Sequence, residues 1–147
     1  ELAALLSNAT AAQRSAMRQY GLAFGTAYQI YDDCVDLFGT ESAAGKSLGT
    51  DLAKGKLTLP LILAWERAST ADRTELERMV ADWNLDSWPR VSALLEHYDT
   101  VSHSLAAIKR YLAEAGKCLE RLPESAGREA LLALTNYLGQ QTHGLAR

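Results

Sequence analysis

One long helical pattern constrains the fold of this chain more than any other feature of its sequence. From about Ala11 to Phe38, apolar side chains recur at helical spacing. At 1.5 Å per residue, this segment predicts a single helix of roughly 40 Å. Such a helix packs one side against other elements. The stripe that we expect to pack consists of Met17, Phe24, Tyr28, Tyr31, Val35 and Phe38.

An acidic stripe lies beside this apolar stripe. Asp32 and Asp36 are four residues apart, Asp33 and Asp36 are three apart, and Gln29 precedes them by about one turn. Both spacings bring side chains to one face of a helix, where like charges repel. A packed helix tolerates that repulsion most easily if a cation binds there, and Mg²⁺ prefers oxygen ligands of this kind. The alternative is a solvated acidic face without a ligand.

A segment rich in glycine and lysine follows the acidic stripe. Residues 39–57 hold four of the ten glycines, and three of the five lysines: Lys46, Lys54 and Lys56. Glycine lets the backbone approach an anion, and lysine can neutralise phosphate charge that Mg²⁺ leaves uncompensated. Gly45-Lys46-Ser47 resembles only the tail of a Walker P-loop, and no strand precedes it. Beside the aspartates, these lysines predict a magnesium–diphosphate site; a solvated loop is the alternative.

Gly21 and Gly25 lie four residues apart inside the long helical pattern. Each costs about 1 kcal/mol relative to alanine in a helix interior. Close helix packing is one explanation for them, and clearance for a ligand beside the acidic face is the other. The sequence does not favour either explanation.

The rest of the chain also reads as helices. Thr58-Leu59-Pro60 has the residue types of a helix start, and the helix after it is apolar almost all round, so we expect it to be buried. We expect Leu131, Leu134 and Leu138 to point inward from the last helix. The further predicted helices cover about residues 70–83, 91–98, 100–122 and 125–141, with a loop at 84–89. No alternation of period two occurs, so the sequence predicts an all-α helical bundle, one domain over residues 1–147.

Composition narrows the possible functions. The chain is 48% hydrophobic and 22% charged, with a net charge of −3, so it gives no reason to expect a nucleic-acid partner. No apolar run approaches the length of a membrane span. Cys34 and Cys118 lie in separate predicted helices without a metal-binding spacing. We expect both to be reduced and buried, which is typical of a cytoplasmic protein.

Two neighbouring motifs resemble a known family. The first is Gly21-x-x-x-Gly25-x-x-Tyr28-Gln29-Ile30-x-Asp32-Asp33-x-x-Asp36. The second is Gly45-Lys46-Ser47-x-Gly49-Thr50-Asp51-Leu52-x-x-Gly55-Lys56-x-Thr58-x-Pro60. Together they resemble the second aspartate-rich motif of the trans-isoprenyl (polyprenyl) diphosphate synthases and the segment after it. The resemblance implies part of the all-helical isoprenoid-synthase fold and a magnesium-dependent prenyltransferase in isoprenoid biosynthesis. That enzyme joins an allylic diphosphate to isopentenyl diphosphate.

The resemblance also implies roles for individual residues. Asp32 would be the principal Mg²⁺ ligand, with Asp33 and Asp36 at the same metal site. Lys46 and Lys56 match lysines that contact the allylic diphosphate, and Lys46 joins the aspartates as a catalytic candidate. Gln29 and Tyr28 match residues near the reacting chains, although the family often has phenylalanine at the tyrosine position. Members of the family are typically homodimers, so we expect a homodimer or another homo-oligomer.

The family's first aspartate-rich motif has no counterpart in these residues. Asp82, Asp86 and Asp99 do not form one. We therefore expect the chain to be a C-terminal portion of a synthase that is inactive by itself and does not reveal product length. A non-catalytic small subunit of a heteromeric prenyl synthase is the alternative. A class I terpene cyclase is a third possibility, but the segment from Gly45 to Lys56 favours the chain-elongating synthases.

Overall fold

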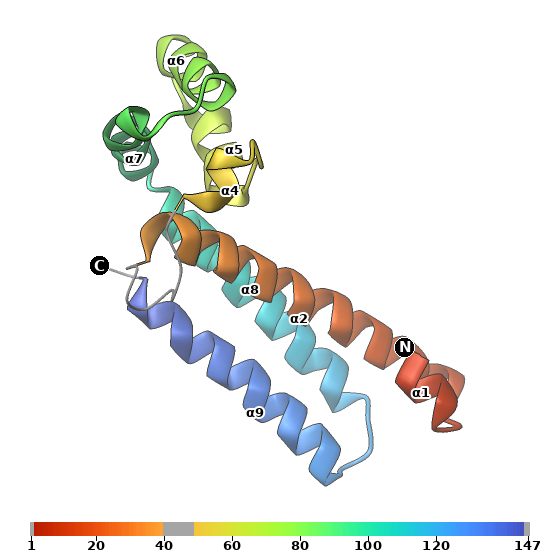
Figure 1. Ribbon diagram of the computed structural model, residues 1–147. Helices are drawn as coiled ribbons and strands as arrows, with labels where there is room; N and C mark the ends of the chain where they lie inside the picture. Colours follow the sequence, from red (N-terminus) through yellow and green to blue (C-terminus); the bar gives the residue numbers. More distant parts are fainter. Residues whose placement is uncertain (1, 40–48, 146–147) are drawn as a thin grey trace. The chain divides into compact units, whose positions relative to one another are not determined.

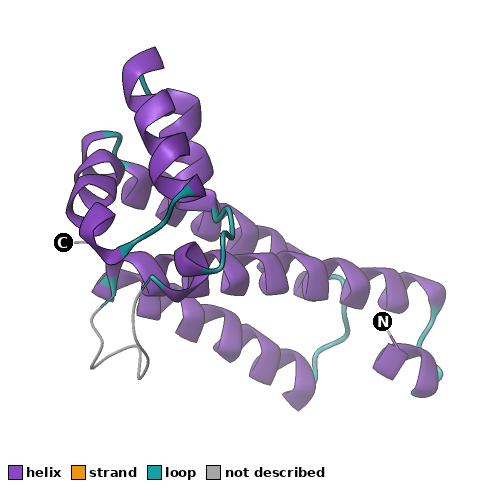
Figure 2. Ribbon diagram, turned by 45° about the horizontal axis from the view of Figure 1, so that its top comes forward, coloured by secondary structure: helices purple, strands orange, loops and turns teal. Residues whose placement is uncertain are grey.

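A computed structural model describes residues 2–39 and 49–145 of the chain (Figure 1). The described residues form helices, turns and loops without a strand, which confirms the all-α prediction (Figure 2). No helix among them is long and apolar enough to cross a membrane. The α-helices are α1 (Leu2–Leu6), α2 (Ala11–Phe38), α4 (Thr50–Ala53), α5 (Leu59–Arg67), α6 (Thr70–Ala81), α7 (Trp88–His97), α8 (Thr100–Glu120) and α9 (Ala126–Gln141), with 3₁₀ turns η1 (Leu85–Ser87) and η2 (Thr142–Gly144).

Local capping signals explain where several helices begin. The Thr10 hydroxyl accepts a hydrogen bond from the Gln13 N–H at 3.3 Å, and the Gln13 side chain accepts one from the Thr10 N–H at 2.8 Å. This reciprocal pair is a capping box at the start of α2. Ser69 and Ser125 cap α6 and α9 by accepting hydrogen bonds from backbone N–H groups three residues ahead. Thr58 precedes α5, whose first turn contains a proline. These helix starts confirm the sequence predictions.

The chain forms two compact units. One comprises Glu1–Gln29 and Ala107–Gly144, and the other comprises Ile30–Ala106 and Leu145–Arg147. Helices α2 and α8 each contribute residues to both units. The units are called unit 1 and unit 2 below, and each has its own buried core.

The core of unit 1 joins α2, α8 and α9. Tyr20 and Ala23 from α2 pack with a buried segment of α8, and Leu131 of α9 packs against this cluster. The Tyr20 hydroxyl lies 3.2 Å from the Leu131 carbonyl oxygen and 3.3 Å from the Thr135 hydroxyl. A buried tyrosine hydroxyl needs such partners. Tyr20 therefore gives α2 both apolar and polar contacts with α9.

The core of unit 2 is built from the end of α2 and from helices α4 to α7. Its buried residues are Leu37, Leu52, Leu61, Ala64, Leu76, Met79, Val91, Leu94 and Leu95. Half-buried aromatic side chains, including Trp83 and Trp88, surround them. Their rings meet edge to face, with centroids 6.4 Å apart, an arrangement that aromatic pairs favour. Leu37 and Leu52 place the end of α2 and the short helix α4 in the same core.

The packing stripe predicted for α2 was only partly correct, because Met17, Phe24 and Phe38 pack against the cores but the fully buried line of the helix consists of other residues. The buried line along the helix is Ala16, Tyr20, Ala23, Ala27, Ile30, Cys34 and Leu37, at alternating spacings of four and three. Most residues of the expected stripe are half-buried, and Tyr28 is 55% exposed. The prediction followed the large side chains, whereas much of the buried line consists of small ones. Cys34 and Cys118 are free and buried, as expected.

Three other expectations need correction. Helix α5 is not buried all round, because Ile62 and Trp65 are exposed and border an apolar groove of about 510 Å³ with α6. Leu134 is exposed, and its neighbour Thr135 is buried and donates a hydrogen bond to the Leu131 carbonyl at 2.8 Å. The expected loop at 84–89 instead contains η1 and the start of α7, because Pro89 occupies the first turn of that helix.

Candidate functional site

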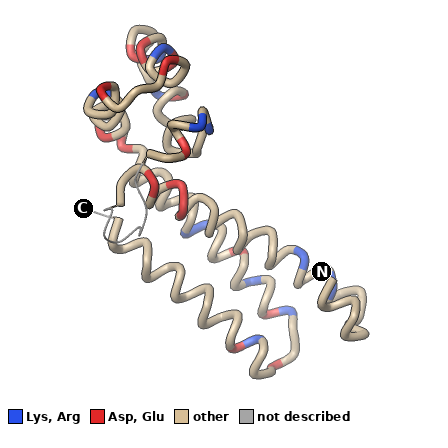
Figure 3. The backbone as a smooth tube through the Cα atoms, in the orientation of Figure 1, with Lys and Arg blue, Asp and Glu red and all other residues tan. Residues whose placement is uncertain are grey.

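Acidic residues cluster on the last turns of α2 (Figure 3). Asp32 and Asp33 are half-buried, whereas Asp36 is 0% exposed. All three come from the part of α2 that belongs to unit 2. The three aspartates of the motif therefore occupy different environments, although their spacing on the helix is that of one face.

Asp36 binds the start of helix α4. Its Oδ1 accepts hydrogen bonds from the Thr50 hydroxyl at 2.8 Å and from the Thr50 N–H at 3.3 Å. Its Oδ2 accepts a hydrogen bond from the Asp51 N–H at 3.1 Å, and its backbone carbonyl accepts one from Gly49 at 2.8 Å. A buried carboxylate requires such donors, and the first N–H groups of a helix lack partners within it. The contact therefore gives the buried carboxylate its hydrogen-bond donors and gives the first N–H groups of α4 an acceptor.

Asp51, in helix α4, forms an ion pair with Lys56, which follows the helix. Lys56 Nζ lies 2.6 Å from Asp51 Oδ1, and the Lys56 N–H also donates to the Asp51 carbonyl at 2.9 Å. The Asp51 contact is the main reason why the pKa of Lys56 is raised above its ordinary value of 10.5. The carboxylates of Asp33 and Asp32 raise it further by their charge. Lys56 is therefore a cation held by an ion pair in the same unit as the acidic face.

Two glycines bracket this arrangement. Gly49 precedes α4 and Gly55 follows it, and each has a φ of 70°. Residues with a Cβ rarely adopt this conformation, so both positions favour glycine. Gly21 and Gly25 differ, because neither has a positive φ, and a Cβ at either would meet no described atom within 4 Å. Among the described residues, these two glycines therefore do not mark a close helix contact, and clearance for a ligand remains a prediction.

The donor set suits a magnesium ion that is shared with a substrate. In residues 2–39 and 49–145, no three His, Cys, Asp or Glu side chains converge as a metal-binding group. Mg²⁺ does not require such a cage, because it keeps several waters and is often bound by one or two carboxylates with substrate phosphates. Asp32 and Asp33 supply oxygen donors of that kind. The residues present therefore fit Mg²⁺ in a complex with a diphosphate.

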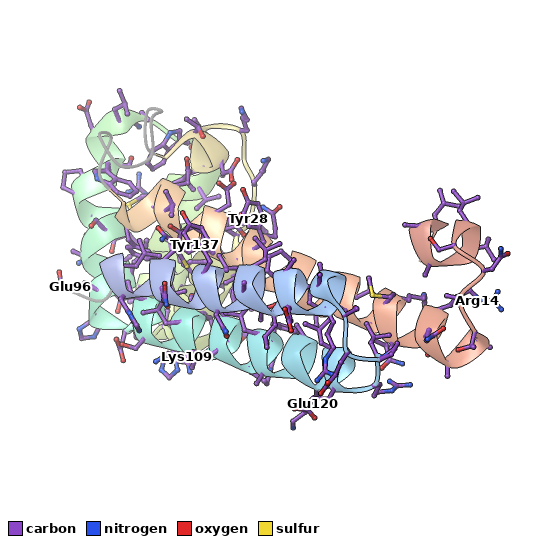
Figure 4. All side chains as sticks on the ribbon, turned by 90° about the horizontal axis from the view of Figure 1, so that it is seen from below. Arg14, Tyr28, Glu96, Lys109, Glu120 and Tyr137 are labelled. Carbon is purple, nitrogen blue, oxygen red and sulfur yellow. The ribbon has the colours of Figure 1, made fainter. Side chains whose placement is uncertain are left out.

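The other predicted site residues lie outside this cluster. Tyr28 and Gln29 are exposed residues of α2 in unit 1, and Tyr28 is labelled in Figure 4. Lys46 lies outside the described residues, with most of the glycine- and lysine-rich segment. The structure therefore brings together Asp32, Asp33 and Lys56 in one unit, linked through Asp36 and Asp51.

Comparison with known sequences shows the family. A family profile described as polyprenyl synthetase matches residues 1–97. This chain belongs to the polyprenyl synthetase family. A short chain isoprenyl diphosphate synthase of Methanothermobacter thermautotrophicus is 31% identical to it over 140 residues. That match covers 95% of this chain and 43% of the relative, so the chain spans less than half the length of this curated family member.

Solved structures of the family agree with the fold. A decaprenyl diphosphate synthase from Rhodobacter capsulatus superposes with a TM-score of 0.85 at 30% identity, covering 96% of this chain and 44% of that one. A geranylgeranyl pyrophosphate synthase from Corynebacterium glutamicum, complexed with calcium and isoprenyl diphosphate, has a TM-score of 0.78 at 28% identity. It is matched over 95% of this chain and 43% of its own. Homologues of this chain are thus prenyl-transferring synthases.

The role of Asp51 as the partner of Lys56 was not predicted from the sequence. The residue belongs to the recognised Gly49-Thr50-Asp51 motif, but no role followed from its spacing. A carboxylate inside a segment rich in glycine and lysine, five residues before Lys56, was the available signal. The structure shows it to be the buried partner of that lysine.

Proposed function

We propose that this chain forms the part of a trans-polyprenyl diphosphate synthase that binds an allylic diphosphate together with Mg²⁺. The observation that carries the proposal is the ion pair of Lys56 with the buried Asp51, in the same unit as Asp32 and Asp33. The solved relative that holds calcium and isoprenyl diphosphate supports a divalent metal for this chain. The reaction would be the condensation of the allylic diphosphate with isopentenyl diphosphate.

In this proposal the acidic face binds the metal ion and the lysines bind the diphosphate. Asp32 is the principal Mg²⁺ ligand, and Asp33 and Asp36 line the same site. Lys46 and Lys56 bind the diphosphate and neutralise the negative charge that increases as it leaves the allylic carbon. Mg²⁺, when bound, would supply further positive charge at the same oxygens.

The remaining assignments complete the proposal. Gln29 and Tyr28 line the site near the reacting hydrocarbon chains. The protein works in the cytoplasm, which the free, buried thiols of Cys34 and Cys118 support, because disulfides are rare there. It acts as a homo-oligomer, as the resemblance implies.

Calorimetry with Mg²⁺ and inorganic pyrophosphate tests the metal face. We expect weak binding that falls at least tenfold in an Asp32→Asn, Asp33→Asn double variant, because the oxygen donors lose their charge. Asp86→Asn is the matched control, since Asp86 is an exposed aspartate of η1. Equal affinity in the double variant and the control would contradict the assigned face.

A synthase assay tests how much of the reaction this chain supports. We propose that the 147 residues bind the Mg²⁺–diphosphate complex without condensing the two substrates, because they contain only one aspartate-rich motif of this kind. The assay supplies the chain with Mg²⁺, a labelled allylic diphosphate and isopentenyl diphosphate. Efficient formation of a longer prenyl diphosphate by this chain alone would overturn that part of the proposal.

A further inference from the structure

The third aspartate of the acidic motif binds protein groups that lie far away in the sequence. Asp36 is fully buried, and its two carboxylate oxygens accept three hydrogen bonds from Thr50 and Asp51. These contacts connect the last turns of α2 to residues 14 and 15 positions further on. Asp36 therefore fixes the position of α4 relative to the helix that carries Asp32 and Asp33.

The next contact connects α4 to Lys56. Asp51 is buried and lies 2.6 Å from Lys56 Nζ, although the lysine side chain itself is 57% exposed. Lys54, two residues earlier, is exposed and has no ion pair with any residue in the described ranges. A buried acceptor holds a lysine in place better than a mobile surface carboxylate does, because its own position is fixed by packing.

From these contacts we infer that Asp36 and Asp51 are positioning residues, which fix the Lys56 ammonium group beside the acidic face through Thr50 and helix α4. The inference deepens the proposed function and rests on it for the identity of the ligand, a diphosphate. A lysine held in place before the diphosphate arrives loses less conformational freedom on binding than a mobile one. Asp36 then serves the diphosphate through Lys56, in addition to lining the metal site.

Chemical modification of the lysines tests the inference without any ligand. The chain is treated with limiting acetic anhydride, and the acetylation rates of Lys56 and Lys54 are compared by mass spectrometry of peptides. We expect Asp51→Asn to accelerate the modification of Lys56 several-fold, because its ammonium group loses the carboxylate that holds it protonated. The rate at Lys54, the internal control, stays constant. An unchanged ratio of the two rates in Asp51→Asn would overturn the inference.

A second pair of variants tests the link through Asp36. We expect Asp36→Asn to accelerate the acetylation of Lys56 although the two side chains do not form a pair with each other. Thr50→Val removes only the hydroxyl donor and should have the same effect to a smaller extent. Circular dichroism checks that each variant is folded, and Thr50→Val keeps the test decisive if Asp36→Asn unfolds. Unchanged Lys56 reactivity in folded Asp36→Asn, or in folded Thr50→Val if Asp36→Asn unfolds, would contradict the role of Asp36.

Pyrophosphate calorimetry on the same variants separates this inference from the proposed function. We expect the affinity of Asp51→Asn for Mg²⁺–pyrophosphate to fall several-fold and Asp51→Glu to recover part of it. If the unsubstituted chain binds no pyrophosphate while the Lys56 reactivity responds as expected, the proposed function fails and the positioning role stands. If pyrophosphate binds normally in Asp51→Asn, the positioning role in diphosphate binding is wrong.

Discussion

Lys56 and Asp51 form a close ion pair, with 2.6 Å between Nζ and Oδ1, in which the lysine side chain is 57% exposed and the aspartate side chain only 8%. Ion pairs between two exposed groups usually contribute little, because both side chains lose freedom and water screens the charges. Here the acceptor is already immobile. The pair is better suited to orienting a cation toward solvent than to stabilising the fold.

Replacing a leucine of unit 2 by alanine should lower the free energy of unfolding at a buried position but hardly at an exposed one. Leu95 of α7 is fully buried, whereas Leu85 of η1 is 81% exposed. We expect Leu95→Ala to lower the free energy of unfolding by about 2–5 kcal/mol, because it leaves a cavity. Leu85→Ala, the matched control, should change it by less than about 0.5 kcal/mol. Urea unfolding followed by circular dichroism measures both, and similar losses would contradict the packing described for α7.

Acid should weaken the contact between α6 and α7 in unit 2. The hydroxyl of Tyr98, 2.7 Å from Asp72, is the main cause that holds the pKa of Asp72 below its ordinary 3.8. A bond from Arg90 likewise holds the pKa of Glu75 below 4.5. Both carboxylates therefore stabilise the folded state at pH values above their unfolded pKa values. That contribution disappears as the pH falls through the lowered pKa values of the folded state.

Thermal unfolding between pH 7 and pH 2.5 measures this effect. The contribution of these carboxylates to the melting temperature should be constant down to about pH 5 and should decline below pH 4.5. Arg90→Gln removes the partner of Glu75, so its melting temperature should approach that of the unsubstituted chain as the pH falls. A constant difference between the two chains across this range would be evidence against the ion pair.

Cys34 should resist thiol reagents in the folded chain. Burial is the main cause that raises the pKa of its thiol to about 12, so almost no thiolate exists near pH 8. Cys118 is also buried but is 8% exposed, against 0% for Cys34. We expect iodoacetamide to modify Cys34 more slowly than Cys118, and both at similar rates in guanidinium chloride. Rapid modification of Cys34 in a folded Cys118→Ser variant would contradict its burial.

The cap of α9 offers a local test of stability in unit 1. The Ser125 hydroxyl accepts a hydrogen bond from the Arg128 N–H at 3.2 Å. We expect Ser125→Ala to lower the free energy of unfolding by about 1 kcal/mol, because an N–H of the first turn loses its partner. Ser102, an exposed residue of α8, is the control, and its replacement by alanine should have little effect. Equal denaturation midpoints for Ser125→Ala and the unsubstituted chain would show that the cap is not needed.

Features that depend on neighbouring residues in the sequence were predicted well. The extent of α2, the start of α5 at Thr58-Leu59-Pro60 and the starts of the helices near residues 70 and 125 follow from local chemistry, because the residue types that begin a helix lie within one turn of its end. The acidic stripe and the lysine-rich segment were identified from spacing and residue type, and their role as a metal and diphosphate site stays a prediction. The structure keeps the three aspartates and Lys56 in one unit.

Features that depend on distant residues were not predictable. Hydrophobicity alone favoured Leu134, but Thr135 takes the buried position, where Tyr20 from α2 meets it. The spacing of Asp36 placed it with the other aspartates, yet its carboxylate binds Thr50 and Asp51 across a long interval of sequence. Each outcome depends on which partner the fold brings near, and spacing along one helix contains no information about that partner.

The backbone at the glycines on either side of α4 favours a D-residue over an L-residue. Gly49 and Gly55 both have a φ of 70°, and a Cβ at either would meet no atom of residues 2–39 and 49–145 within 4 Å. An L-residue is disfavoured there by its own backbone, since surrounding atoms leave room for a side chain. A D-residue prefers this mirror-image conformation. In a chemically synthesised chain, D-alanine at either position should therefore preserve the segment that positions Lys56, whereas L-alanine should strain it.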